Sequence, residues 1–163
     1  MSKILIIDDE SAIANLVSDA LEDEGFETVI CSDGNEAYDY IESHSSEISL
    51  ITLDIMMPGL SGLELCRMIR SKVDCPIIFV SAKGKTLDTV LGLEMGGDDY
   101  ISKPFVVEEL VARVKAHLRR EERNRDIFED GVIKVGDIEI HTGSFEVFKN
   151  SKPIQFSTRE FQL

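Results

Sequence analysis

The sequence has 163 residues, of which 43% are hydrophobic and 29% charged, and its formal net charge is −14 at pH 7. This composition is ordinary for a folded chain and excludes global disorder. The longest apolar runs, such as Ile4–Ile7, are far too short to cross a membrane. The N-terminus also lacks the long apolar core of a secretory signal. We therefore expect a cytoplasmic protein without a membrane partner.

The charge is distributed unevenly along the chain. Residues 1–118 contain 9 basic and 22 acidic residues, a net charge of −13, whereas residues 119–163 contain 8 and 9, a net charge of −1. This difference predicts two modules with different roles. The first module is too acidic to bind nucleic acid by itself, because phosphate contacts need basic groups. The three cysteines form no CxxC pair, so we expect buried thiols at Cys31, Cys66 and Cys75.

The first 120 residues alternate short apolar runs with amphipathic stretches of helical spacing. The predicted strands are Ile4–Ile7, Thr28–Cys31, Leu50–Leu53, Ile77–Val80 and Tyr100–Ile101. The predicted helices surround Ala12–Leu21, Ala37–Ile41, Leu63–Ile69, Val90–Leu93 and Leu110–Leu118. Continuous apolar runs, without alternation of apolar and polar residues, favour parallel strands covered on both faces. Five strand–helix repeats therefore predict a doubly wound α/β sheet.

The remainder of the chain follows a different pattern. The charged run from Leu118 to Asp126 loses its apolar periodicity, so we interpret it as the fraying end of the fifth helix and a linker. We assign 1–120 to the first domain, 121–130 to the linker and 131–163 to an incomplete second domain. The predicted strands of this second domain are Val132–Val135, Asp137–His141, Phe145–Lys149 and Pro153–Phe156, a small antiparallel meander. Ser157–Glu160 has the form of a capping box that opens a helix close to the end of the sequence.

Polar residues that could carry chemistry follow four of the predicted strands. In order along the chain they are Asp8, Asp9 and Glu10, then Asp54, Ser81 and Lys103. Since functional groups in an open α/β sheet gather at the carboxyl ends of the strands, we expect these side chains to meet at one edge. Crowded carboxylates repel one another, and Mg²⁺ with its preference for oxygen ligands relieves that repulsion. A carboxylate beside such an ion can act as a nucleophile toward phosphorus, with Lys103 and Ser81 holding the phosphoryl oxygens.

Each of these residues also has an ordinary structural interpretation when taken alone. Asp9 could cap the helix that begins near Glu10, and a lysine before a proline is usually a solvated loop residue. Their joint placement after four strands favours a site. The stretch Gly84–Thr86 resembles the end of a phosphate-binding loop, but its required first glycine would fall at Phe79. The three histidines, His44, His117 and His141, adjoin no nucleophile and are interpreted as surface residues.

Four stretches closely resemble the bacterial response-regulator receiver domain, which has a flavodoxin-like (βα)5 fold with strand order 2-1-3-4-5. They are Ile4–Glu10, Leu53–Gly59, Val80–Lys83 and Gly96–Phe105. The resemblance covers residues 3 to about 120 in uninterrupted order. Residues 131–163 resemble the first part of the winged-helix DNA-binding domain of the OmpR/PhoB subfamily, mainly through Thr158–Phe161. Such a protein is a two-component regulator switched by phosphorylation.

The resemblance implies a role for each residue of the predicted site. Asp54 is the phosphoacceptor and receives its phosphoryl group from a sensor histidine kinase, while Ser81 and Lys103 bind that group. The Mg²⁺ ligands are Asp9, Asp54 and the Met56 carbonyl, and Asp8 contributes through water. Tyr100 turns inward as Ser81 moves toward the phosphate, which reshapes the face made by the fourth helix, fifth strand and fifth helix. The resemblance also implies a cis peptide between Lys103 and Pro104.

Homodimers of this subfamily form through charged pairs on that switch face. Asp99, Glu109 and Arg113 are present, but Thr89 replaces the basic residue expected on the fourth helix. One salt bridge between subunits is therefore lost. Since exposed pairs contribute about 0–1 kcal/mol, we expect a weaker dimer.

The sequence leaves three candidate functions. The first is a phosphorylation-switched transcription regulator, which would bind promoter DNA only as a longer chain, since the expected recognition helix would follow residue 163. The second is a truncated receiver that acts as an interaction module without DNA binding. The third, a phosphatase with an aspartyl-phosphate intermediate, is disfavoured because such enzymes use Asp-x-Asp after the first strand, where this chain has Asp8-Asp9-Glu10. We therefore expect that the protein is not an enzyme.

Overall fold

The computed structural model describes residues 2–82, 90, 94–129, 132–141, 146–149 and 152–154. The chain divides into two compact units, Met1–Leu118 and Arg119–Leu163, which are considered separately. Among the described residues, no helix combines the length and the apolar character that a membrane span requires.

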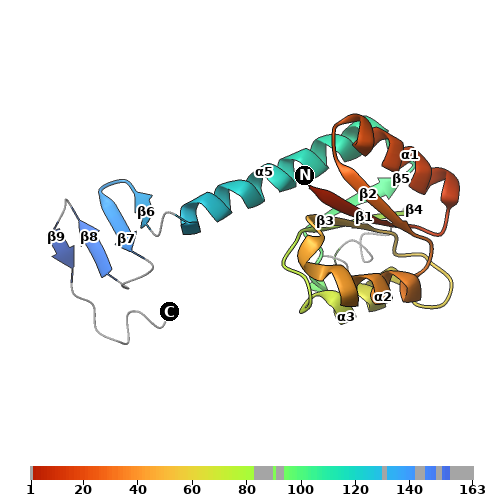
Figure 1. Ribbon diagram of the computed structural model, residues 1–163, viewed down its shortest axis with the longest axis horizontal. Helices are drawn as coiled ribbons and strands as arrows, with labels where there is room; N and C mark the ends of the chain where they lie inside the picture. Colours follow the sequence, from red (N-terminus) through yellow and green to blue (C-terminus); the bar gives the residue numbers. More distant parts are fainter. Residues whose placement is uncertain are drawn as a thin grey trace. The chain divides into compact units, whose positions relative to one another are not determined.

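The first unit is built on a parallel sheet with strand order β2-β1-β3-β4-β5, the order that was predicted (Figure 1). Its strands are β1 Lys3–Ile7, β2 Glu27–Cys31, β3 Leu50–Leu53, β4 Ile77–Ala82 and β5 Asp99–Lys103. The connecting elements are α1 Ser11–Asp23, α2 Gly34–His44, the short 3-10 helix η1 Ser45–Glu47, and α3 Gly62–Ile69. The flavodoxin-like fold is therefore confirmed. Most of the predicted fourth helix lies outside the described residues, which here include only Val90 and Glu94.

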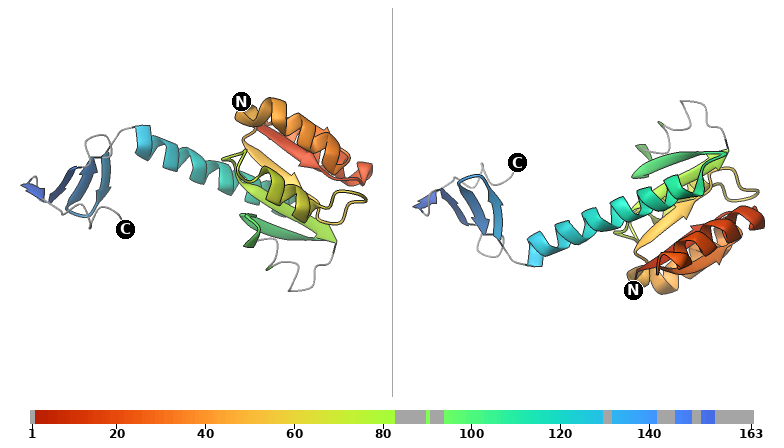
Figure 2. Two further views of the ribbon diagram at one scale, coloured as in Figure 1. Left: turned by 90° about the horizontal axis from the view of Figure 1, so that it is seen from below. Right: turned by 90° about the horizontal axis from the view of Figure 1, so that it is seen from above.

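Two apolar cores lie on opposite faces of this sheet. Helices α2 and α3 cover one face, and α1 with the first part of α5 (Val107–Glu129) covers the other (Figures 1 and 2). Side chains along β4 alternate between the two cores, with Phe79 in the first and Ile78 and Val80 in the second. Because both faces are covered, β1 and β3 are almost entirely buried, which explains their unbroken apolar sequences.

Local side-chain contacts fix where two of the helices begin. Asp33 caps α2, because its side chain accepts a hydrogen bond from the Glu36 N–H at 2.8 Å. Ser61 and Glu64 form a capping box at the start of α3. At α1 the capping residue is Glu10, and it makes no side-chain cap bond. The cap considered for Asp9 is therefore absent, which leaves the Asp9 carboxylate without that structural role.

Helix α5 continues to Glu129. The prediction that it frays after Leu118 and is followed by a linker at 121–130 is therefore wrong, because most of the predicted linker is helical. The segment contains no glycine or proline from Val107 to Glu129, and arginine and glutamate are strong helix formers. Loss of apolar periodicity after Leu118 therefore marks the point where the helix no longer contributes to the core of the first unit. It does not mark the end of the helix.

The second unit contains an antiparallel sheet in the order β6-β7-β8-β9. Its strands are β6 Val132–Val135, β7 Ile138–His141, β8 Glu146–Lys149 and β9 Lys152–Ile154. The turn between β6 and β7 contains Gly136 with a φ of 61°, a conformation that glycine adopts without strain. Assignment of this sheet to a winged-helix domain stays a prediction, and the expected capping box at 157–160 lies outside the described residues.

Candidate functional site

The site lies where β1, β3 and β5 end at the same edge of the parallel sheet. Asp8 and Asp54 directly follow β1 and β3, and each is fixed by one more backbone hydrogen bond to the neighbouring strand. The Asp8 N–H donates to the Cys31 carbonyl at 3.1 Å, and the Asp54 N–H donates to the Ile7 carbonyl at 2.9 Å. Both side chains are almost completely buried, at 5% and 3% exposure. The parallel register therefore brings the two carboxylates together, as predicted.

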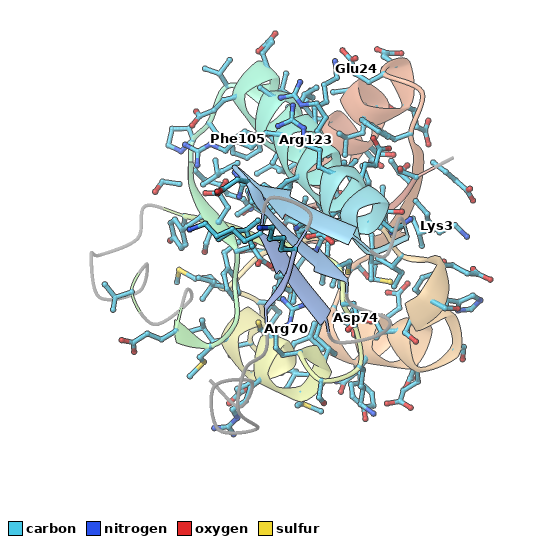
Figure 3. The ribbon with its side chains drawn as sticks, turned by 90° about the vertical axis from the view of Figure 1, so that its left-hand side faces the viewer. Lys3, Glu24, Arg70, Asp74, Phe105 and Arg123 are labelled. Atoms are coloured by element: carbon cyan, nitrogen blue, oxygen red, sulfur yellow. The ribbon has the colours of Figure 1, made fainter. Side chains whose placement is uncertain are left out.

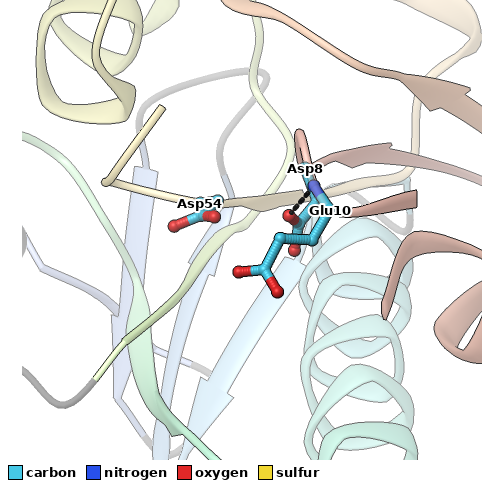
Figure 4. A group of neighbouring side chains, drawn as sticks. All are labelled: Asp8, Glu10 and Asp54. Carbon is cyan, nitrogen blue, oxygen red and sulfur yellow. Dashed lines mark hydrogen bonds between the residues drawn. The ribbon is translucent and has the colours of Figure 1, made fainter. Parts of the chain in front are cut away.

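Glu10 completes a group of three carboxylates with Asp8 and Asp54 (Figure 4). One oxygen from each residue lies within 4.8 Å of the others. The Glu10 N–H donates to Asp8 Oδ1 at 2.9 Å, which orients the Asp8 carboxylate. Unlike the two aspartates, Glu10 is exposed, so it lies at the mouth of the group. The predicted ligand set did not include this residue, although its position directly after Asp8-Asp9 was visible in the sequence.

Lys103, the last residue of β5, supplies the positive charge among these carboxylates. Its Nζ lies 2.8 Å from Asp8 Oδ2, 3.2 Å from Asp54 Oδ2 and 3.4 Å from Glu10 Oε1. The lysine is 8% exposed and is followed by a cis peptide bond to Pro104, as the resemblance implied. The buried ammonium therefore offsets part of the repulsion between the two buried carboxylates that it contacts.

Burial and charge shift the pKa values of both central residues. Burial raises the pKa of Asp54 above its usual value, and neither the charge of Lys103 nor the hydrogen bond from the Met56 N–H overcomes this effect. For Lys103, burial acts to lower the pKa, but the hydrogen bond to Asp8 and the charge of Asp54 outweigh it, so the pKa is raised. The lysine therefore stays charged at neutral pH, while ionised Asp54 carries an unfavourable free energy.

The other two predicted metal ligands occupy different positions. Asp9 is exposed, and its carboxylate is not part of the group of three. The Met56 side chain is also exposed, and its backbone N–H donates to Asp54 Oδ1 at 3.0 Å, which orients the phosphoacceptor candidate. Gly62, the first residue of α3, allows the close approach of this loop, because a Cβ there would lie 2.1 Å from the Asp54 carbonyl oxygen.

The two predicted switch residues lie on the neighbouring strands β4 and β5. Ser81 is 1% exposed, and its Oγ has no hydrogen-bond partner within the described part of the chain. The hydroxyl oxygen of Tyr100 is buried, and the ring packs against the core formed by α2 and α3. The Ser81 hydroxyl lies on β4, next to the end of β3 that Asp54 follows. Because this hydroxyl is buried, it is suited to donate a hydrogen bond to an anion that binds there.

The acidic group has the composition that a hard divalent cation requires. Three carboxylates and one ammonium carry a net charge of −2, which one divalent ion neutralises. All three acids offer oxygen donors, and the exposed position of Glu10 leaves the group open toward solvent. The residues present therefore fit the Mg²⁺ that the resemblance implies.

The residues predicted for the dimer face form a network within the first unit. Arg113 Nη1 contacts Asp99 Oδ1 at 2.8 Å, and its Nη2 contacts Glu109 at 2.9 Å. His117 joins them, with its Nε2 3.1 Å from Asp99 Oδ2. His117 is buried, so its interpretation as a surface residue was wrong; its position three residues after the buried Val114, on the apolar side of the helix, could have indicated it. Thr89 lies outside the described residues.

Comparison with known proteins agrees with this geometry. Residues 4–115 match the family described as "Response regulator receiver domain". The chain is similar to the Francisella response regulator 1452 receiver domain, with 34% identity over 74% of this chain and 99% of that one and a TM-score of 0.69. It is also similar to DrrB, an OmpR/PhoB homologue from Thermotoga maritima, with 31% identity over 99% of this chain and 70% of that one and a TM-score of 0.67. A third similar structure is the BeF3-activated receiver domain of Klebsiella pneumoniae RstA, with 32% identity over 72% and 99% of the two chains and a TM-score of 0.67.

Proposed function

The chain belongs to the response regulator receiver domain family, and from this premise we propose that Asp54 accepts a phosphoryl group from a histidine kinase in a Mg²⁺-dependent reaction. The observation that supports this most directly is the buried Asp54 carboxylate, held by Lys103 Nζ at 3.2 Å beside two further acids. Since the three carboxylates and the Lys103 ammonium carry a net negative charge, this group is suited to bind a cation.

The proposed transfer forms one bond and breaks one bond. An Asp54 oxygen attacks phosphorus, the P–N bond to the kinase histidine breaks, and that imidazole retains the electron pair and takes up a proton from water. Bound Mg²⁺ would supply charge neutralisation and orientation of the phosphoryl oxygens. Asp8, Asp54 and Glu10 offer carboxylate oxygens to the ion, and the resemblance adds Asp9 and the Met56 carbonyl.

Two other residues would bind the transferred group. Lys103 would exchange part of its contact with Asp54 for a phosphoryl oxygen, since its raised pKa keeps it charged. Ser81 Oγ, which is buried and has no partner among the described residues, would donate to a second phosphoryl oxygen. Movement of Ser81 would then favour the conformer in which Tyr100 lies inward, a shift between pre-existing populations. The protein would act as a switch, without turning over a separate substrate.

The test is the intact mass after incubation with acetyl phosphate, with and without Mg²⁺. We expect a gain of one phosphoryl group that needs Mg²⁺ and disappears in Asp54→Ala. Asp39→Ala is the matched control, since Asp39 is an exposed aspartate on α2 away from the site. Phosphoryl incorporation into Asp54→Ala at the rate of the control variant would contradict the assignment. Transfer from a phosphorylated histidine kinase would then identify the donor class.

For the output we propose an OmpR/PhoB-type regulator, supported by similarity to DrrB over 99% of this chain. Phosphorylation would favour a homodimer through β5 and α5, in which Asp99, Glu109 and Arg113 exchange partners between subunits. Sedimentation velocity with and without the phosphodonor tests this, with Asp99→Asn expected to weaken the dimer. Promoter binding that strengthens on phosphorylation is part of this proposal.

The alternative is an interaction module whose phosphorylated face binds another protein without DNA binding. The compact receiver unit, Met1–Leu118, contains the whole predicted phosphorylation site and supports this alternative equally well. A gel-shift series with and without the phosphodonor separates the two, because only the first proposal expects promoter binding that strengthens on phosphorylation.

A further inference from the structure

Arg70 directly follows the last residue of α3 (Figure 3). Its side chain binds the segment that leads into β4. Its Nη2 donates to the carbonyl oxygens of Val73 and Cys75, at 3.1 and 2.7 Å. Its Nη1 donates to the Gly96 carbonyl at 2.8 Å and contacts Asp98 Oδ2 at 3.3 Å. One planar guanidinium therefore joins the segment before β4 to the segment before β5, a role that its fixed fork of donors suits.

Asp98 adds a second connection between the same two strands. Its Oδ2 accepts a hydrogen bond from the N–H of Ile77, the first residue of β4, at 2.8 Å. Its own N–H donates to the Ile77 carbonyl at 2.7 Å. Because Asp98 directly precedes β5, these contacts fix the starts of β4 and β5 against each other. We call Arg70, Gly96 and Asp98, with the carbonyls of Val73 and Cys75, the Arg70 clamp.

The aliphatic part of the Arg70 side chain packs closely against the backbone of Gly96. Gly96 has a φ of +106°, and a Cβ at this position would lie 2.5 Å from Arg70 Cδ and 2.8 Å from Cγ. The residue therefore has to be glycine both for its conformation and for the space that Arg70 occupies. The preceding residue is held as well, because Cys66 Sγ lies 3.5 Å from the Met95 carbonyl.

The opposite ends of β4 and β5 carry the groups of the proposed site. Ser81 lies near the end of β4, Lys103 ends β5, and Tyr100 lies between the clamp and Lys103. The two strands pair in unbroken parallel register from Ile78–Asp99 to Ala82–Lys103. The clamp thus holds the amino ends of both strands, while the phosphoryl group would act at their carboxyl ends.

We propose that the Arg70 clamp keeps the amino ends of β4 and β5 in place while Ser81 and Tyr100 change conformation. This inference rests on the proposed phosphorylation of Asp54. With the clamp in place, movement of Ser81 toward the phosphoryl group cannot be absorbed by sliding of β4 against β5 or by displacement of residues 95–98. The change is then passed to Tyr100. Arg70 is a positioning residue, since it touches no atom of the acidic group, and its loss would reduce the coupling between phosphorylation and the Tyr100 conformer.

The test uses protein labelled with 3-fluorotyrosine, whose three tyrosines give three ¹⁹F signals. Tyr100→Phe assigns the Tyr100 signal by its disappearance. Acetyl phosphate and Mg²⁺ are added, phosphoryl content is measured by intact mass, and the Tyr100 shift reports the switched fraction. The variant is Arg70→Gln, and the matched control is Arg67→Gln, which removes the same charge from an exposed position on α3.

We expect Arg70→Gln to take up the phosphoryl group at a rate within about twofold of the wild type. The ratio of switched to unswitched Tyr100 in the phosphorylated protein should fall about tenfold, which corresponds to roughly one net hydrogen bond in the switched conformer. Arg67→Gln should match the wild type in both readouts. Asp98→Asn serves as a milder variant, because its amide oxygen can still accept from Ile77, and should lower the ratio in the same direction.

The possible failures can be distinguished. A full Tyr100 shift in phosphorylated Arg70→Gln and Asp98→Asn would overturn the clamp inference and leave the proposed function intact. Equal losses of phosphoryl uptake and Tyr100 shift would also overturn it, because they would indicate general destabilisation. No phosphoryl uptake by the wild type would overturn the proposed function and the clamp inference together.

Discussion

Removal of the Asp54 charge is expected to stabilise the protein in the absence of metal. The Asp54 oxygens lie within 4.8 Å of those of Asp8 and Glu10. At an effective dielectric constant of about 20, a charge pair at this upper limit of distance repels by about 3.5 kcal/mol, and the Glu10 repulsion is reduced by solvent because that side chain is exposed. The Lys103 ammonium, at 3.2 Å, attracts Asp54 by about 5 kcal/mol. The Coulomb contributions therefore nearly cancel, and the loss of hydration of the buried carboxylate decides the sign.

On this basis Asp54→Asn should raise the free energy of unfolding by about 1–2 kcal/mol at pH 7, because the neutral amide avoids the burial penalty of the charged carboxylate but still has a smaller burial cost of its own. Mg²⁺ at 100 times its dissociation constant should stabilise the wild type by about 2.7 kcal/mol. It should stabilise Asp54→Asn much less, because that variant lacks one of the carboxylates.

The pH dependence has a defined sign. Since the pKa of Asp54 is raised in the folded state, the folded protein binds this proton more tightly than the unfolded chain. This carboxyl therefore lowers stability as pH rises from about 4 through the folded pKa, and the penalty is complete above it. The difference between Asp54→Asn and the wild type should grow over the same interval and stay constant at higher pH.

The assay is urea unfolding followed by far-UV circular dichroism, since the chain has no tryptophan. Asp39→Asn, an exposed aspartate, controls for the general effect of removing one negative charge. The reasoning would be refuted if Asp54→Asn were less stable than the wild type without metal, or if Mg²⁺ stabilised both proteins equally.

Three further results are expected. Lys103→Met leaves two buried carboxylates without their ammonium and should lower the free energy of unfolding by about 3–5 kcal/mol; an unchanged urea midpoint would contradict this. Gly62→Ala would place a Cβ 2.1 Å from the Asp54 carbonyl oxygen and should cost about 1–3 kcal/mol, with slower phosphoryl uptake measured by intact mass. Burial acts to raise the pKa of Asp99, but the hydrogen bonds from His117 and the Tyr100 N–H and the charge of Arg113 hold it below its usual value. The stability that Asp99 contributes is present above its unfolded pKa and is lost as pH falls through the folded pKa. His117→Gln should therefore raise the Asp99 pKa in a ¹³C carboxyl titration, and an unchanged value would show that His117 has no role there.

The position of the carboxylates was predictable because it depends on backbone register alone. Parallel strands buried on both faces give continuous apolar runs, and the first polar residue after each run marks a strand end. Asp8 and Asp54 follow β1 and β3 directly, so their meeting at one edge follows from the sheet order. Lys103 was predictable in the same way, as the last residue of β5.

Other features depend on side-chain reach and loop path, which a sequence pattern does not contain. Asp9 and Glu10 are adjacent acids, yet only Glu10 belongs to the group of three, although it lies one residue further from the end of β1. Its side chain is longer than that of Asp9. The partners of Arg70 are mainly backbone carbonyls in two loops, and no residue type marks a carbonyl as an acceptor. The length of α5 was underestimated because loss of apolar periodicity was equated with the end of the helix.

Alternation along β4 and β5 indicates which face of the sheet transmits the proposed switch. Phe79 lies in the core under α2 and α3, and it pairs with Tyr100, which packs against the same core. Ser81 is two residues after Phe79, so its side chain projects to that same face. Phe79 is 0% exposed, and a closely packed interior transmits displacement instead of absorbing it. Ser81, Phe79 and Tyr100 therefore share one face of the sheet, and we expect the proposed switch to act through the packing on this face. The core under α1 and α5 contains Ile78 and Val80, which alternate with these residues along β4. We therefore expect this second core to keep its packing when Ser81 moves.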